Sequence, residues 1–268
     1  MASSGSGYDL SSSTFSPDGR IFQVEYASKA VENAGTALGL KCRDGVVLCV
    51  EKPLLNKMLL SNSSRRIHTV DSYSGVAVTG FVSDGRQIVN RAREEAASYE
   101  ETYGSKIPPS ILGERVASYF HYFTLHGSLR PFGVSALIAS YDPETKEHAL
   151  QMVEPSGVSY QFFGCAAGKG RQPAKTEMEK LALNKPDMAD NIDTREGVKQ
   201  LARIIHLLHE EGKDKPFELE MSWLCEESGW QHKGVPRDYI KEAVAWAKKD
   251  IEEAEEEDDS DEDEEMDE

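Results

Sequence analysis

The sequence predicts an α+β fold with four layers, αββα, in which two stacked antiparallel sheets are flanked on each side by helices. Strand-like segments come in groups separated by pairs of amphipathic helices: three strands, two helices, three strands, two helices, one strand and one helix. Short turns join the strands within a group, as expected for antiparallel neighbours. The 268 residues are enough for one large domain of this kind.

The first group begins at a turn, because in residues 16–19 Pro17 presets φ and Gly19 allows a positive φ. Apolar residues at helical spacing then predict a helix over residues 19–33, and Gly35 is a plausible stop. From Thr36 the spacing of apolar residues shortens from that of a helix to that of a strand. Asp-Gly at 44 and 45 is a strong signal for a β-hairpin turn.

The remaining elements are predicted from the helical spacing or the strand-like alternation of apolar residues. A turn of Pro, Ser and Gly at 155–157 separates two of the strands, and residues 217–223 show the clearest alternation of apolar and polar side chains. The predicted strands cover 75–81, 132–141, 148–154, 158–164 and 217–223. The predicted helices cover 88–103, 108–123, 170–183, 198–208 and 240–251.

Charge and composition divide the chain into three parts. The first 14 residues are rich in Ser and Gly and predict a flexible arm, whereas 15–250 predict a single domain. Residues 251–268 hold 14 of the 47 acidic residues and no basic one, which predicts a disordered acidic tail. The domain and arm together carry 33 acids against 30 bases, so we expect a protein partner and neither nucleic acid nor a membrane.

Several chemistries find no support in the sequence. Residues 164–171 look like a phosphate loop, but Phe163 and Gly170 stand where that motif needs Gly and Ser or Thr. His206 and His209 lie one turn apart without a third zinc ligand nearby in the sequence. The four cysteines are scattered, so we expect reduced thiols, no metal and no cofactor. Without an apolar span or a signal peptide, we expect the chain in the cytoplasm and nucleus.

Thr36 is the one candidate nucleophile. The order of elements suits N-terminal-nucleophile hydrolases, in which processing exposes a threonine whose own α-amine serves as the base. Here 35 residues precede Thr36, so it is an ordinary strand residue unless the chain is cleaved after Gly35. An active threonine hydrolase that uses Thr36 after processing is the alternative interpretation.

The run from Tyr8 to Ala27 closely resembles the amino-terminal signature of proteasome alpha subunits. Within that family the chain is most similar to the type-3 branch, which occupies the seventh position of the eukaryotic alpha ring. The reasons are Tyr8-Asp9-Leu10, residues 29–33, residues 213–220 and the acidic end. Further matching segments are 35–39, 44–47, 130–133, 155–157 and 168–169.

The resemblance implies a non-catalytic subunit of the 20S core particle with the fold of N-terminal-nucleophile hydrolases. Alpha subunits retain the amino-terminal extension, and Gly35 stands where beta subunits have their nucleophilic threonine. The expected partners are other alpha subunits in a hetero-heptameric ring, the beta ring, and regulatory particles or activators bound by their carboxyl-terminal tails. The implied function covers ring assembly and substrate entry in ubiquitin-dependent and ubiquitin-independent protein degradation.

The resemblance also assigns a gating cluster, which sets the conformation of the ring's gate. The matching residues are Tyr8, Asp9, Pro17 and Tyr26. A carboxylate–tyrosine hydrogen bond and proline packing can hold an arm in one of two positions. Leu10 departs from the family, where many members have Arg, so no salt bridge forms from this position.

An activator-tail pocket is implied at Arg66, Gly80 and Phe81. Family members have a Lys at the position of Arg66, and this Lys pairs with the carboxylate of the activator tail. The alternative to a pocket is that Arg66 is an ordinary surface residue at the start of a strand. Arg66 also stands near the position of the beta catalytic lysine. Arginine keeps the charge but differs from lysine in bulk and geometry.

Ser260 precedes four acidic residues and suits an acid-directed kinase, so it is a phosphorylation candidate. The alternative for the tail is a solvated segment that only aids solubility. A free acidic adaptor that acts outside any ring is a third interpretation of the whole chain.

Overall fold

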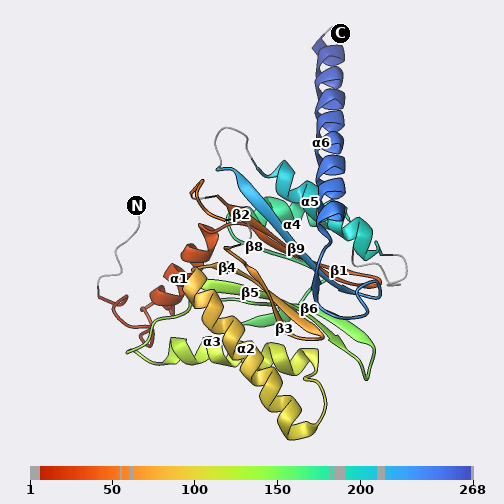
Figure 1. Cartoon of the computed structure of the whole chain (residues 1–268). Coiled ribbons are helices and arrows are strands. Elements are labelled where there is room, and N and C mark those ends of the chain that lie inside the picture. Colours follow the sequence, from red (N-terminus) through yellow and green to blue (C-terminus); the bar gives the residue numbers. More distant parts are fainter. Residues whose placement is uncertain are drawn as a thin grey trace.

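A computed structural model describes residues 7–54, 56–60, 63–181, 183, 191–209 and 215–266. Two five-stranded antiparallel sheets are stacked face to face and have helices on their outer sides (Figure 1). The strand order is β10-β9-β2-β1-β8 in the first sheet and β3-β4-β5-β6-β7 in the second. The predicted αββα fold is confirmed.

Helices α4, α5 and α6 cover the first sheet, whereas α2 and α3 cover the second. The helices are α1 (Phe22–Glu32), α2 (Val82–Tyr103), α3 (Pro109–Leu125), α4 (Arg171–Lys180), α5 (Thr194–Leu207) and α6 (Arg237–Met266). The strands are β1 (Ala37–Cys42), β2 (Gly45–Pro53), β3 (Ile67–Asp71), β4 (Ser74–Gly80), β5 (Val134–Asp142), β6 (Glu147–Val153), β7 (Ser159–Gln161), β8 (Gly164–Ala167), β9 (Phe217–Cys225) and β10 (Lys233–Gly234).

Three apolar clusters fill the three spaces between the layers. Successive side chains of a strand point to opposite faces, so a central strand contributes to two clusters. In β2, Val47 and Cys49 pack toward α4–α6, whereas Val46 and Leu48 pack against the second sheet. Burial on both faces explains why this strand is almost continuously apolar, without the alternation of a half-buried strand.

The sequence does not predict three of the strands: β3, β8 and β10. The strand expected over 158–164 is shorter than predicted, because β7 ends at Gln161 and the chain then crosses to the first sheet as β8 (Gly164–Ala167). Strand β8 contains only small side chains and looks like a loop in the sequence, whereas β10 has two residues. Such short strands depend on their neighbours for hydrogen bonds and carry almost no periodicity of their own.

The amino-terminal arm contacts the domain within the described residues. Ser12 is buried, and its hydroxyl donates to the carbonyls of His126 (2.9 Å) and Leu129 (3.1 Å). The sequence predicts a flexible arm over 1–14, of which 1–6 lie outside the described residues. From Ser12 onward the arm is instead anchored beside the end of α3.

Helix α6 extends further than predicted. The helix continues to Met266 and projects from the domain (Figure 1), and the disorder expected over 251–268 stays a prediction. Glutamate and alanine favour helix, no Gly or Pro interrupts the segment after Pro236, and Lys249 pairs with Glu253 one turn later at 3.0 Å. Among the described helices, α6 included, none is both long enough and apolar enough to span a bilayer.

Asp84 in the first turn of α2 ties this helix to the loop before β5. Its buried carboxylate accepts from both terminal nitrogens of Arg130 (2.6 and 2.8 Å) and from the backbone N–H of Gly133 (2.9 Å). The Arg130 guanidinium, followed by the Gly133 N–H, lowers the pKa of Asp84 against the opposing effect of burial. The ionised form is the one that the fold stabilises.

We therefore expect Asp84→Asn to lower the free energy of unfolding at pH 7 by about 1–2 kcal/mol, with half-exposed Arg130 limiting the effect. The pKa of Asp84 is lower in the folded than in the unfolded chain. The stabilisation by ionised Asp84 is therefore fully present above the usual pKa range of carboxyl groups, and it is lost as the pH falls through the pKa of the folded state. Urea unfolding of the purified chain between pH 3 and 7 measures the difference. The exposed control Asp238→Asn should change little, and an equal loss in both variants at pH 7 would contradict the assignment.

Candidate functional site

Thr36 lies directly before β1, and both its backbone N–H and its hydroxyl have partners within the fold. Thr36 is 3% exposed, and its backbone N–H donates to Glu51 Oε2 at 3.1 Å. Its hydroxyl oxygen accepts from the N–H of Gly170 at 3.1 Å. Both groups that a threonine hydrolase would use are thus engaged in the fold.

Gly35 lies in a space that admits no side chain. A Cβ at this position would collide with the carbonyl of Glu51, and the Gly35 carbonyl accepts from the hydroxyl of Thr79 at 2.5 Å. The loop after β8 closes over the same point: Lys169 N–H donates to the Ala34 carbonyl at 2.9 Å, and Gly168 has a φ of +98°. The run that resembles a phosphate loop therefore packs on the Gly35–Thr36 segment.

Arg66 lies at the start of the second sheet, partly covered by β9. Its guanidinium donates to the carbonyl of Gly80 at 3.2 Å, and its backbone N–H donates to Glu220 Oε2 at 2.9 Å. Desolvation by burial lowers the pKa of Arg66 while Glu220 raises it. The guanidinium remains a cation at neutral pH, because the ordinary pKa of arginine is above 12.

Gly80 and Phe81 complete this constellation at the junction of β4 and α2. Gly80 has a φ of +126°, and a Cβ there would collide with the Gly133 carbonyl. The N–H of Phe81 donates to that carbonyl at 2.9 Å, whereas its side chain is exposed. The structure thus brings Arg66 into contact with Gly80, and Phe81 follows Gly80 with an exposed ring.

Two of the four residues expected in the gating cluster are in contact. Tyr26 on α1 donates its hydroxyl to Asp9 Oδ2 at 3.3 Å, and Gln23 Nε2 donates to the Asp9 carbonyl. Desolvation, and after it the charge of Asp9, raises the pKa of Tyr26, so the phenol stays a donor. Tyr8 is partly exposed and Pro17 lies in the exposed turn before α1, without a described contact to this pair.

Sequence reasoning missed Gln23 and Glu220. Gln23 lies three residues before Tyr26 on the same helical face, so its spacing could have indicated a contact with the arm. The Glu220 carboxylate on β9 of the first sheet accepts from the backbone N–H of Arg66, although the two residues are 154 positions apart in the sequence. A contact at that separation has no signature in a single sequence.

The remaining candidates give no metal site. Among the described residues, no three His, Cys, Asp or Glu side chains could hold a metal ion together. His206 and His209 flank the Phe217 ring, with centroids 5.1 and 4.6 Å away. The four cysteines are buried, and burial raises the pKa of the Cys165 thiol to about 12. Ser260 falls on α6, but its side chain lies outside the described residues.

Comparison with known proteins agrees with this geometry. A family model for the proteasome subunit matches residues 31–224, and a second model, for the N-terminal signature of A-type proteasome subunits, matches residues 8–30. The chain is 54% identical to proteasome subunit alpha type-3 of Arabidopsis thaliana over 253 residues, which is 94% of this chain and 98% of the relative. It is 53% identical to the protein of that name from Acanthamoeba castellanii, over 94% of this chain and 96% of the relative.

A third relative is called probable proteasome subunit alpha type-7, from Saccharomyces cerevisiae. It is 48% identical over 252 residues, covering 94% of this chain and 86% of the relative. The resemblance found in the sequence is confirmed by relatives that span nearly the whole chain. The chain belongs to the family of proteasome alpha subunits.

Proposed function

We propose that this chain controls substrate entry through its amino-terminal arm and receives activator tails at Arg66. Alpha-type subunits are the non-catalytic ring subunits of the proteasome, and the chain is one of them. It assembles with other proteasome subunits. The observation that carries the proposal is the packing at Gly35 and Thr36, where no side chain fits at Gly35 and the Thr36 N–H and hydroxyl are both engaged.

We propose a hetero-heptameric alpha ring with a beta ring below it as the setting for this function, in the cytoplasm and nucleus. The nearly neutral charge of residues 1–250 supports burial between ring neighbours, since clustered charge would incur a desolvation cost. The ring would admit substrates of both ubiquitin-dependent and ubiquitin-independent degradation. The competing functions are a processed threonine hydrolase and an adaptor outside any ring.

The pocket binds a tail through complementary charge. Arg66 uses one of its five N–H donors on Gly80, which leaves donors for a carboxylate. Partial burial reduces solvent screening of such a pair. The exposed ring of Phe81 offers an apolar surface for the side chain that precedes the tail's carboxylate.

The gate depends on a weak contact between the arm and α1. The Tyr26–Asp9 hydrogen bond is long and exposed, so it contributes little to stability but can bias the arm between two positions. Phosphorylation of Ser260 would add negative charge to a segment that already has 14 acids, so its effect should be on partner binding and not on the fold.

The first prediction concerns Thr36. In particles isolated with this subunit, intact-mass analysis should show no cleavage between Gly35 and Thr36, because the Thr36 backbone N–H and hydroxyl are both engaged in the fold. Thr36→Ala should leave the particle's peptidase rates unchanged once assembly is matched. A chain that begins at Thr36, together with loss of one activity in the variant, would establish the hydrolase alternative.

The second prediction concerns the pocket. Arg66→Glu should weaken binding of an activator's carboxyl-terminal peptide to the particle by about tenfold or more, since it replaces an attractive charge by a repulsive one. Arg66→Lys should retain most of the affinity. Fluorescence anisotropy with the labelled peptide measures both.

Arg65→Ala provides a control for the pocket, because the neighbouring Arg65 side chain lines another cavity to which Arg66 does not contribute. Equal weakening by Arg65→Ala and Arg66→Glu would argue against a specific carboxylate site.

The third prediction concerns the gate. Tyr26→Phe removes only the hydroxyl that donates to Asp9, and one such bond is worth about 0.5–1.5 kcal/mol. Basal peptide hydrolysis by the particle without activator should therefore rise about two- to tenfold. Tyr103→Phe, at another exposed tyrosine on α2, is the control and should have no effect. Unchanged hydrolysis in Tyr26→Phe would remove the Asp9–Tyr26 pair from the gate.

A further inference from the structure

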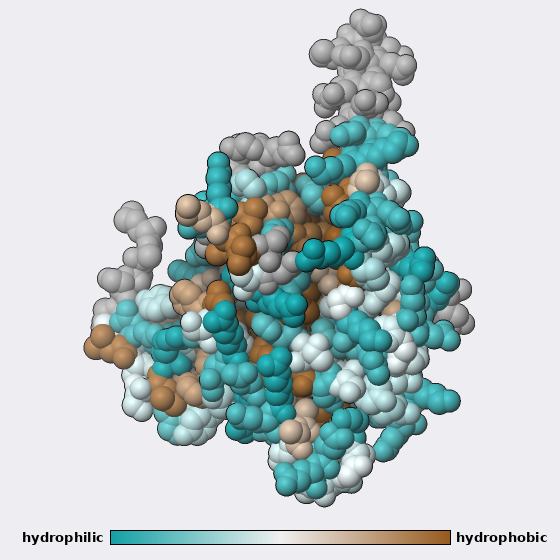
Figure 2. Space-filling model, viewed as in Figure 1, coloured by the Kyte–Doolittle hydropathy of each residue, from teal (hydrophilic) through white to brown (hydrophobic). Residues whose placement is uncertain are grey.

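A large groove lies between the foot of α6 and the adjoining edges of the two sheets. Its volume is about 1300 Å³, and β3, β9, β10 and α6 supply most of its lining. Apolar atoms are visible in the hollow beside the base of α6, surrounded by hydrophilic side chains (Figure 2). The apolar lining includes Phe217, Leu219, Ile240 and Val244.

The floor of the groove is an open strand edge. On one side, β9 pairs with β2 along its whole length, but on the other side only Ser222 and Trp223 pair with β10. The Met221 carbonyl accepts from Val235 N–H on this second side, whereas the Pro216 carbonyl accepts from Leu54 on the first. The N–H and C=O groups of successive residues in a strand point alternately to its two sides. The two odd-numbered residues between Pro216 and Met221 therefore direct these groups toward the groove.

Those two residues are Phe217 and Leu219. Within the described part of the chain, their N–H and C=O groups have no hydrogen-bond partner. A strand edge with free donors and acceptors can pair with an additional extended segment. Strand β10 already occupies the far end of this edge, so an added segment would continue an existing ladder.

The rim of the groove carries excess positive charge although the whole chain has a net charge of −17. Arg65, Arg237 and Lys248 are exposed and form no ion pair among the described residues. The two carboxylates of the lining are already engaged: Glu218 lies 3.2 Å from Lys52, and Glu220 lies 3.6 Å from the same buried ammonium.

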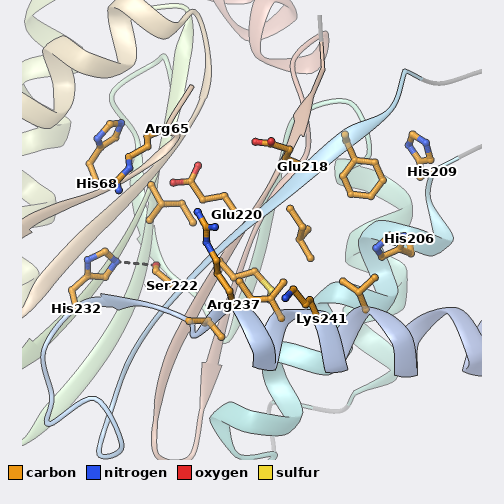
Figure 3. A pocket seen from close by; sticks show the side chains of 18 of the residues that line it. Arg65, His68, His206, His209, Glu218, Glu220, Ser222, His232, Arg237 and Lys241 are labelled. Carbon is orange, nitrogen blue, oxygen red and sulfur yellow. Dashed lines mark hydrogen bonds between the residues drawn. The ribbon is translucent and has the colours of Figure 1, made fainter. Parts of the chain in front are cut away.

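The two walls differ in chemistry (Figure 3). Arg65 and His68 lie on the side of β3, whereas α6 presents Arg237, Lys241 and its apolar residues on the other side. His232 closes one end, where its ring bonds Ser222 and Thr69, each at 2.9 Å. An added strand would therefore direct alternate side chains toward the side of β3, where Arg65 lies, and toward α6, which carries Ile240, Val244 and, one turn further, Lys248.

We propose that this groove binds an extended segment of a partner protein, in which apolar and acidic side chains alternate, by adding a strand to the edge of β9. The backbone of Phe217 and Leu219 forms the ladder. The apolar residues of the segment pack on Ile240 and Val244 of α6, and its carboxylates pair with Arg65 on the side of β3, while Lys248 adds positive charge at the rim. The site lies apart from the Arg66 pocket, because Arg66 is not among the residues that line the groove.

The experiment uses particles that contain the full chain and a fluorescein-labelled peptide of four Val-Glu repeats. We expect saturable binding by anisotropy. A version with a photoreactive side chain should crosslink to residues 217–221 of this subunit, as mapped by mass spectrometry. The same peptide with alternate backbone nitrogens methylated should lose binding, because methylation removes the donors of the ladder while retaining charge and side chains.

Charge reversal tests the rim. Arg65→Glu combined with Lys248→Glu should weaken binding about tenfold, since two exposed attractions become repulsions. Lys175→Glu, an exposed lysine on α4 outside the groove, should leave binding unchanged. A Val-Lys peptide should bind more weakly than the Val-Glu peptide.

Three results would overturn the proposal. One is absence of saturable binding. Another is equal binding of the methylated peptide, which would show association without a ladder. The third is binding to the free chain but not to the particle, which would mean that a ring neighbour covers the groove. None of these results bears on the Arg66 pocket, so the two proposals can fail separately.

Discussion

The peptide bond between Gly35 and Thr36 is the constraint on which the rest of the structure depends. Strand β1 begins there, the loop after β8 closes over it, and Thr79 of the second sheet donates to the Gly35 carbonyl. Both sheets and the amino-terminal helix therefore meet at the Gly35–Thr36 segment. Cleavage there would free the α-amine of Thr36 but would also detach α1 and the arm. A chain that retains α1 therefore lacks the free amine that a threonine hydrolase needs.

Strand β3 separates two surfaces with different chemistry. The Arg66 guanidinium donates to the Gly80 carbonyl, whereas the adjacent Arg65 lines the groove beside α6. Glu220 links the two surfaces, because its carboxylate accepts from the backbone of Arg66 and lies near buried Lys52. A partner that pulled β9 outward would disturb the backbone that positions Arg66, so the two sites share one structural support.

Most of the fold follows from periodicity and turn chemistry in the sequence. The hairpin at Asp44-Gly45 and the alternation from Phe217 to Trp223 each predict their strands correctly. Strand β8 could not be predicted in this way, because Gly164 and its small neighbours become a strand only through pairing with β1. For the site, a motif indicated Asp9 and Tyr26, but the support from Glu220 depends on a contact between distant segments and required the structure.

The long helix α6 has a consequence for its own stability. An α-helix has a macrodipole whose carboxyl-terminal end carries partial negative charge, and acidic residues there are unfavourable. The sequence places 14 acidic residues and no basic one at 251–268, towards the end where the dipole is negative, so lower pH or added salt should favour the helical backbone. The buried Ala243 and Ala247 hold the beginning of the helix on the domain under either condition.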